Sequence, residues 1–198
     1  MEEKKVYILV EGVADKHFLE EYVSHLGYDD FEIHSIDGKD KLKGLTSTLK
    51  QKEDNEIKTA IIFDADSDPA ARRHELQNIL REGKSPSSAS IFLIPNDADA
   101  GCLEDLLEHL VPDAYKPIMT EWNNFIDSLQ NLPTQLIKKE NLPSTKAKFY
   151  SYASLLRKVG ELEKNGAETT RPYKDVEHWD LNTPYLGPLK SFLEDLLR

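Results

Sequence analysis

The chain has 198 residues, of which 39% are hydrophobic and 31% are charged, and it carries a formal net charge of −11. This composition is that of a globular protein rather than a disordered one, and no stretch approaches the roughly 20 apolar residues that a membrane-spanning helix needs. The one cysteine, Cys102, excludes a disulfide framework within the chain, and we expect a cytoplasmic protein without a membrane segment.

Strands and helices alternate through the first half of the chain. Four short apolar runs predict strands, and segments with helical periodicity separate them. The expected strands are residues 5–10, 31–36, 59–63 and 90–94, and the expected helices between them are residues 15–27, 40–52 and 69–82. This alternation favours a parallel sheet with helices on both faces.

The pattern changes after residue 95, where only helices are predicted. The expected helices are residues 102–111, 112–132, 146–163 and 187–198. We therefore expect an α/β core over residues 1–112 and a helical extension over residues 113–198. The extension is expected to pack on the core, so that the two form one compact domain.

Acidic side chains follow three of the four predicted strands. Glu11 follows the first strand, with Asp15 four residues later, and the third strand runs into Asp64 and Asp66. The segment after the fourth strand contains Glu104. Ligands of parallel sheets bind at the carboxyl ends of the strands, and Asp64 and Asp66 point to the same side if the chain there is extended. Oxygen ligands of this kind suit Mg²⁺ or Mn²⁺.

Each of these acids also has a purely structural interpretation. Asp15 and Glu104 can be first-turn acids that favour the helix dipole, with Glu104 on a solvated helix. Asp68, directly before Pro69, is better explained as a helix N-cap than as a ligand. The chain has no His or Cys spacing for zinc, no P-loop and no dinucleotide-binding motif. Cys102 near a helix start has acidic neighbours, which oppose a reactive thiolate.

Two segments taken together resemble the Toprim domain of topoisomerases, bacterial primases and OLD-type nucleases. They are "VEGVADKHFL" and "FDADSDP". That family has a glutamate at the end of its first strand and a DxD pair at the end of a later one. The segments "GCLEDLL", "KAKFYSY" and "HWDLNTPYLGPLKSFL" extend the similarity to a small stand-alone Toprim-like family over nearly the whole chain. The implied fold is a Toprim-like (Rossmann-like) four-stranded parallel sheet flanked by helices, with a C-terminal helical extension.

The resemblance implies a metal-dependent enzyme that acts on nucleic acid, DNA or RNA. The expected activity is that of a Mg²⁺- or Mn²⁺-dependent nuclease, or a related phosphotransfer enzyme. An acidic chain is compatible with this activity because cations offset clustered ligands. The implied metal ligands are Glu11, Asp15, Asp64, Asp66 and Glu104. The implied catalytic residues are Glu11, Asp64, Asp66 and Lys148.

A lysine near the carboxylates would neutralise charge in the transition state. Lys146 or Lys148 in "TKAKFY" is the best match to the lysine of the OLD-like branch, with Lys148 on a helix that can face the strand ends, and Lys16 and Lys39 compete with them. All of these lysines can also be ordinary solvated side chains.

Two other functions stay open at this point. One is a non-catalytic Toprim-like module that binds nucleic acid, a nucleotide or a partner protein, which the acidic charge and the lack of accompanying ATPase or tyrosine-bearing domains keep open. The other is a Mg²⁺-dependent phosphohydrolase of small molecules, although "DADSD" lacks the threonine or valine of an aspartyl-phosphate loop.

Overall fold

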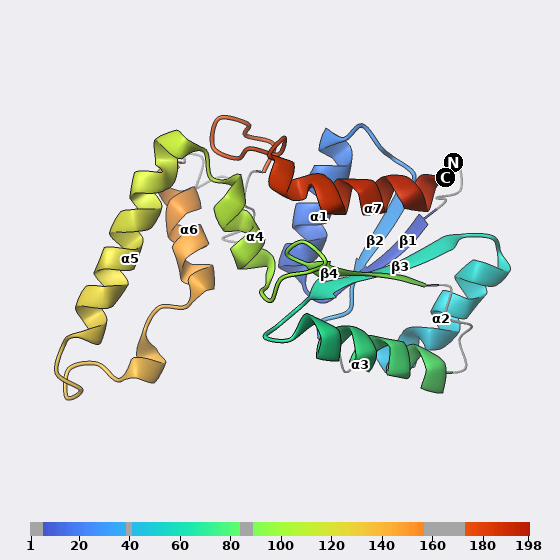
Figure 1. Cartoon of the computed structure of the whole chain (residues 1–198), viewed down its shortest axis with the longest axis horizontal. Coiled ribbons are helices and arrows are strands. Elements are labelled where there is room, and N and C mark those ends of the chain that lie inside the picture. The colour runs from blue at the N-terminus through green and yellow to red at the C-terminus, as the bar shows by residue number, and fades with distance from the viewer. Residues whose placement is uncertain (1–5, 39–40, 84–88, 157–172) are drawn as a thin grey trace, which may run out of the picture. The chain divides into compact units, whose positions relative to one another are not determined.

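The first half of the chain folds around a four-stranded sheet. The computed structural model describes residues 6–38, 41–83, 89–156 and 173–198 (Figure 1). All strands are parallel, in the order β2-β1-β3-β4. The strands are β1 Val6–Val10, β2 Phe31–Ser35, β3 Lys58–Asp64 and β4 Ser90–Ile94. The predicted α/β fold with a parallel sheet flanked by helices is confirmed. None of the helices in the described ranges is long and apolar enough to cross a membrane.

The helices follow the predicted order along the chain. They are α1 Val13–His25, α2 Leu42–Asp54, α3 Pro69–Glu82, α4 Leu103–Leu110, α5 Lys116–Gln130, α6 Thr145–Leu156 and α7 Gly187–Leu197, with the short turns η2 Asp113–Tyr115, η3 Lys139–Asn141 and η4 Pro184–Leu186. The helix expected at 112–132 is divided, because Pro117 stands in the first turn of α5, where proline favours a new start. The last seven residues of the helix expected at 146–163 lie outside the described residues.

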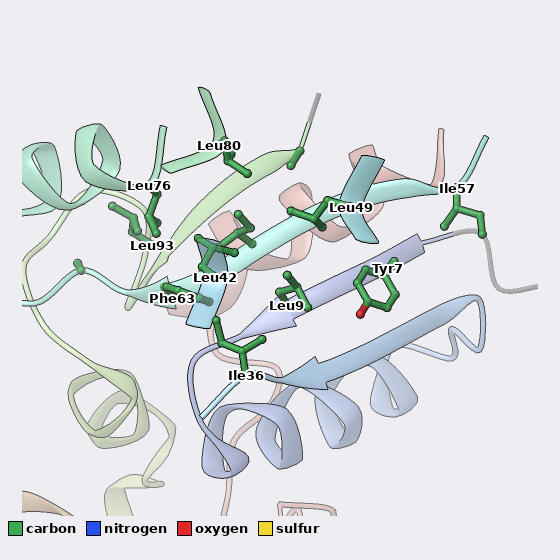
Figure 2. Close-up of a cluster of buried hydrophobic side chains, with 13 residues drawn as sticks. Tyr7, Leu9, Ile36, Leu42, Leu49, Ile57, Phe63, Leu76, Leu80 and Leu93 are labelled. Carbon is green, nitrogen blue, oxygen red and sulfur yellow. The ribbon is translucent and has the colours of Figure 1, made fainter. Parts of the chain in front are cut away.

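Both faces of the sheet are covered, which explains why its strands are continuously apolar. Figure 2 shows one face, where Tyr7, Leu9 and Phe63 pack with side chains of α2 and α3 in a buried cluster. The helices α1 and α7 lie on the other face (Figure 1). There the ring centroids of Phe92 on β4 and Phe192 on α7 are 5.2 Å apart. Successive residues of a strand thus pack into the hydrophobic cores on opposite faces of the sheet.

The chain divides into two compact units. The first unit comprises Met1–His109 and Leu181–Arg198, and the second comprises Leu110–Asp180. The division differs from the predicted one, which assigned everything after residue 112 to a helical extension. The closing helix α7 belongs instead to the first unit, because its apolar side chains, among them Phe192, pack on the sheet.

The second unit has an aromatic core of its own around Trp179, which is 1% exposed. The centroid of its ring system lies 5.2 Å from that of Tyr152, 5.1 Å from that of Tyr173 and 6.3 Å from that of Phe149. The Tyr152 hydroxyl donates a hydrogen bond to the carbonyl of His178 at 2.8 Å. Burying the one polar atom of Tyr152 therefore leaves it satisfied.

The outer edge of β4 is covered by two side chains. The Arg73 guanidinium donates to the carbonyl of Ile91 at 3.0 Å, and a carboxylate oxygen of Asp97 accepts the N–H of Leu93 at 2.8 Å. The N–H of Asp97 in turn donates to the carbonyl of Leu93 at 2.7 Å. Asp97 has φ +70° and forms an ion pair with Arg73, so the pair is held against the edge.

Candidate functional site

The ends of β1 and β3 place two carboxylates beside each other in the first unit. Val10 and Ile62 are register partners in the parallel pair of these strands. Glu11 directly follows Val10, and Asp64 comes two residues after Ile62 and closes β3. Their side chains therefore leave the sheet at neighbouring points of its carboxyl edge, where parallel sheets bind ligands.

Asp64 is the most strongly perturbed acid at this edge. Its Oδ1 accepts the backbone N–H of Leu103 at 3.0 Å, which brings the start of α4 to the strand end. Burial is the largest cause of the rise in the pKa of Asp64 to about 8. Negative charges raise this pKa further, in the order Asp15, Glu11 and Glu104, and the bond from Leu103 opposes the rise. Four of the five predicted metal ligands thus interact electrostatically here.

Asp15 has both the structural role and the surroundings of a ligand. It is the third residue of α1, and its Oδ2 accepts the N–H of the N-cap residue Gly12 at 2.8 Å, as the acid of a capping box does. The side chain is nevertheless buried, with the residue only 8% exposed. Burial, as the largest cause, raises the pKa of Asp15 to about 6, the Gly12 bond lowers it, and the charges of Glu104 and Glu11 raise it. A helix cap alone would not need such an environment.

Glu104 does not lie on a solvated helix face. It is in the first turn of α4, as expected, but is only 3% exposed. The Cys102 thiol donates a hydrogen bond to Glu104 Oε2 at 3.4 Å. Burial, followed by a hydrogen bond to Asp105, raises the pKa of Cys102 to about 12. The thiol is therefore protonated at neutral pH and is a poor nucleophile.

Arg72 is the residue at this edge that sequence analysis missed. It lies in the first turns of α3 and is 3% exposed. Its Nη2 donates to Glu11 Oε2 at 2.7 Å, its Nε to the main-chain carbonyl of Asp64 at 3.2 Å, and its Nη1 to Glu75 at 2.9 Å. One signal for it exists in the sequence. A cation near a helix N-terminus opposes the helix dipole, which indicates that acidic partners from elsewhere stabilise it.

Asp66 does not continue the strand in the way its alternate spacing suggested. β3 ends at Asp64, and Asp66 has φ +54°. Its backbone forms an isolated antiparallel bridge with Gly101. Its side chain is 61% exposed, and one carboxylate oxygen lies 3.7 Å from Nε of Arg72. The expectation that Asp64 and Asp66 share one side of an extended segment is therefore wrong, because the chain bends between them.

Gly101 makes the backbone bridge to Asp66 feasible. It has φ +144°, which side chains rarely allow, and a Cβ added there would lie 2.7 Å from a carboxylate oxygen of Asp105. The loop before α4 can therefore approach the end of β3 only with glycine at this position.

Asp68 has the role predicted for it. It is the N-cap of α3, and its Oδ1 accepts the N–H of Ala71 at 2.9 Å. Its side chain is exposed. Asp68 is therefore not one of the carboxylates that gather around Asp64.

The predicted catalytic lysine belongs to the second unit. Lys148 lies on α6, is 5% exposed, and has its Nζ 6.0 Å from the ring centroid of Phe149. Its role beside the carboxylates of the first unit stays a prediction from the resemblance. Among the competing lysines, Lys16 forms an ion pair with Glu20 at 3.6 Å, and Lys39 lies outside the described residues.

Comparison with known families covers almost the entire chain. The model of a family described as "Protein of unknown function (DUF3226)" matches residues 5–198. The chain belongs to this DUF3226 family. No curated protein and no solved structure matches it. The site of this DUF3226 chain therefore has to be interpreted from its own geometry.

The donor atoms of this DUF3226 site fit a hard divalent cation in their chemistry. Across residues 6–38, 41–83, 89–156 and 173–198, no group of three or more His, Cys, Asp or Glu side chains is already spaced to hold a metal ion. Asp64 and the carboxylates around it are nevertheless oxygen donors, and the pKa values of Asp64 and Asp15 are raised by burial and by neighbouring negative charges. A bound divalent cation would offset both the cost of burying these negative charges and the repulsion between them. The residues that would hold it are Glu11, Asp15, Asp64 and Glu104.

Proposed function

We propose that the chain is a Mg²⁺- or Mn²⁺-dependent nuclease of the Toprim-like kind, or a related phosphotransfer enzyme that acts on nucleic acid. The observation that carries this proposal is the convergence on Asp64 of three other carboxylates, two of which are buried. They come from the end of β1, the start of α1 and the start of α4. Acids whose pKa is raised by burial and by neighbouring carboxylates are uncommon except where a function requires them.

The excess of negative charge around Asp64 supports a metal cation as the ligand of these carboxylates, in place of the proton that Asp64 binds without it. Near neutral pH the raised pKa of Asp64 keeps much of this carboxyl protonated in the absence of other cations. A bound divalent cation would favour the ionised carboxylates, activate water and stabilise negative charge on a phosphate. Arg72 contributes one fixed positive charge, at 2.7 Å from Glu11.

The protein's own groups would orient the ligands. The N–H of Leu103 engages Oδ1 of Asp64, which leaves Oδ2 for a cation. The N–H of Gly12 holds Asp15 in the same way. In this proposal Lys148, on α6, supplies positive charge to the phosphate, as the resemblance implies.

The test is a Mn²⁺ titration by calorimetry, together with cleavage assays on single-stranded DNA, duplex DNA and RNA. The variant is Asp64→Asn, which keeps an oxygen acceptor for Leu103 but removes the charge. The matched control is Asp68→Asn, because asparagine is also a good N-cap and Asp68 is exposed. We expect Asp64→Asn to weaken Mn²⁺ binding by at least about 100-fold and to abolish cleavage, with Asp68→Asn unchanged.

A different result would favour the other function. Wild-type protein that binds nucleic acid without Mn²⁺ and without cleavage would contradict the enzyme and support the non-catalytic module. Equal loss of Mn²⁺ binding in both variants would assign the ion to general surface charge instead of this site.

A further inference from the structure

Three carboxylates of the site each have one oxygen engaged by a donor of the protein itself. Two of the donors are backbone N–H groups and the third is a guanidinium. The pairs are Asp64 Oδ1 with Leu103 N at 3.0 Å, Asp15 Oδ2 with Gly12 N at 2.8 Å, and Glu11 Oε2 with Arg72 Nη2 at 2.7 Å. The other oxygen of each carboxylate is therefore the better ligand for a cation, because the engaged oxygen has already used one of its lone pairs.

Arg72 is fixed by contacts that do not depend on Glu11. Its Nε donates to the main-chain carbonyl of Asp64 at 3.2 Å, and its Nη1 donates to Glu75 at 2.9 Å. The guanidinium also lies 5.5 Å from the ring centroid of Phe63, and the side chain is 2% exposed. The guanidinium of Arg72 is buried and hydrogen-bonded to several groups, so its position is fixed. It therefore determines the orientation of the Glu11 carboxylate.

The number of oxygens that a carboxylate offers affects which divalent cation is preferred. Ca²⁺ takes six to eight oxygen ligands and readily uses both oxygens of one carboxylate, whereas Mg²⁺ requires an octahedron of six ligands, several of them water. We propose that Arg72 makes Glu11 a one-oxygen ligand and thereby makes the site selective for Mg²⁺ or Mn²⁺ over Ca²⁺. This inference rests on the proposed function. Arg72 is a positioning residue in it, because it acts through Glu11.

The experiment compares dissociation constants for Mn²⁺ and Ca²⁺ in the full chain, each measured by calorimetry at one pH and ionic strength. The variants are Arg72→Gln and Arg72→Lys. The control is Arg81→Gln, which removes the same charge from an exposed position on the same helix. The quantity of interest is the ratio of the two constants, because general damage or a lost charge weakens both ions together.

We expect Arg72→Gln to weaken Mn²⁺ binding by about 10- to 100-fold, the usual effect of removing a group that orients a ligand. Ca²⁺ binding should weaken much less, because the released Glu11 can offer both oxygens. The preference for Mn²⁺ should therefore fall by at least about tenfold. Arg72→Lys keeps the charge without the fork and should give an intermediate ratio, and Arg81→Gln should keep the wild-type ratio.

If Arg72→Gln leaves the ratio of the Mn²⁺ and Ca²⁺ dissociation constants unchanged, the inference is overturned and the proposed function stays in place. Tighter Mn²⁺ binding in Arg72→Gln has the same meaning, because Arg72 would then compete with the ion. Wild-type protein that binds neither ion overturns the proposed function and the inference with it.

Circular dichroism reports whether each variant folds. If Arg72→Gln does not, Glu75→Ala takes its place. Glu75 has a side chain that is 42% exposed, and removing it loosens one anchor of Arg72. The ratio should then shift in the same direction by a few-fold, and an unchanged ratio has the same adverse meaning.

Discussion

The starts of α1 and α3 each contain a carboxylate that accepts a backbone N–H three residues away, but the two carboxylates lie in opposite environments. Asp15 accepts the N–H of Gly12 at 2.8 Å, and Asp68 accepts the N–H of Ala71 at 2.9 Å. Both helices follow strands of the same sheet, at its carboxyl edge. Asp15 is buried among other carboxylates and has its pKa raised to about 6, whereas Asp68 is exposed to solvent.

In the proposed function, this difference separates a structural acid, Asp68, from a functional one, Asp15. The hydrogen bond alone explains why each helix begins where it does. It does not explain why Asp15 is kept near Glu11, Asp64 and Glu104, where burial and repulsion oppose its charge. An arrangement that costs stability in the metal-free protein indicates a role outside folding.

The largest expected effect is the pH dependence of the metal-free protein. The pKa of Asp64 is about 8 when folded and near 3.8 when unfolded, so the folded chain binds this proton more tightly. The contribution of this group to stability is therefore fully present below about pH 3.8 and is lost as the pH rises to about 8. At about 1.4 kcal/mol per pKa unit, the three units between pH 5 and this pKa predict a loss of about 4 kcal/mol between pH 5 and pH 8.5.

The measurement is thermal unfolding in EDTA at pH 5 and pH 8.5, for wild-type protein and for Asp64→Asn. The wild-type Tm should fall by at least about 6 °C more than that of the variant. Saturating Mn²⁺ should recover the difference at pH 8.5. A wild-type Tm that rises with pH relative to the variant would mean that Asp64 serves as a cap for α4 only.

A smaller effect is expected for Asp15→Asn, which sharpens the comparison of the two helix starts. Asparagine keeps an oxygen for Gly12 and removes the buried charge. In EDTA at pH 8.5 we expect stabilisation by about 1.5 kcal/mol, seen as a Tm higher by about 3–6 °C. Destabilisation at that pH would show that the charge of Asp15 favours folding through the helix dipole, in which case its cluster with Glu104 is unimportant.

The smallest effect is expected at the exposed start of α3. Asp68→Ala removes the N-cap and should cost about 1 kcal/mol, or about 2–4 °C in Tm, at any pH above 5. Asp68→Asn should cost little, and neither variant should alter Mn²⁺ binding. Urea unfolding with and without Mn²⁺ checks both statements. If Asp68→Asn weakens Mn²⁺ binding, Asp68 at the start of α3 belongs to the same site as Asp15 at the start of α1.

The order of elements could be predicted from the sequence because short apolar runs and helical periodicity are local properties. The run that ends at Phe63 is continuously apolar, and the structure extends it to Asp64. Asp68 was predictable as a cap for the same reason, since its partner is three residues away. That acids would gather at one edge followed from the parallel sheet, as far as Glu11 and Asp64 are concerned.

Other features depend on distant partners or on backbone conformation, which the local pattern does not contain. Arg72 meets Glu11 across 61 residues, so neither residue indicates the other. Asp66 has a positive φ, which its residue type only weakly suggests. The chain therefore does not continue as an extended strand from Asp64 to Asp66. The helix α7 is amphipathic, but only its packing through Phe192 shows which unit it joins.

The side chains on the outer edge of β4 have a consequence for assembly. The Ile94 carbonyl bonds inward to Ala65, so the groups of Ile91 and Leu93 face away from the sheet. These are the groups that Arg73 and Asp97 occupy. An unprotected edge strand invites pairing with another chain and aggregation. Here the ion pair stands where a fifth strand would bond, so the sheet cannot be extended on this side unless the pair is first displaced.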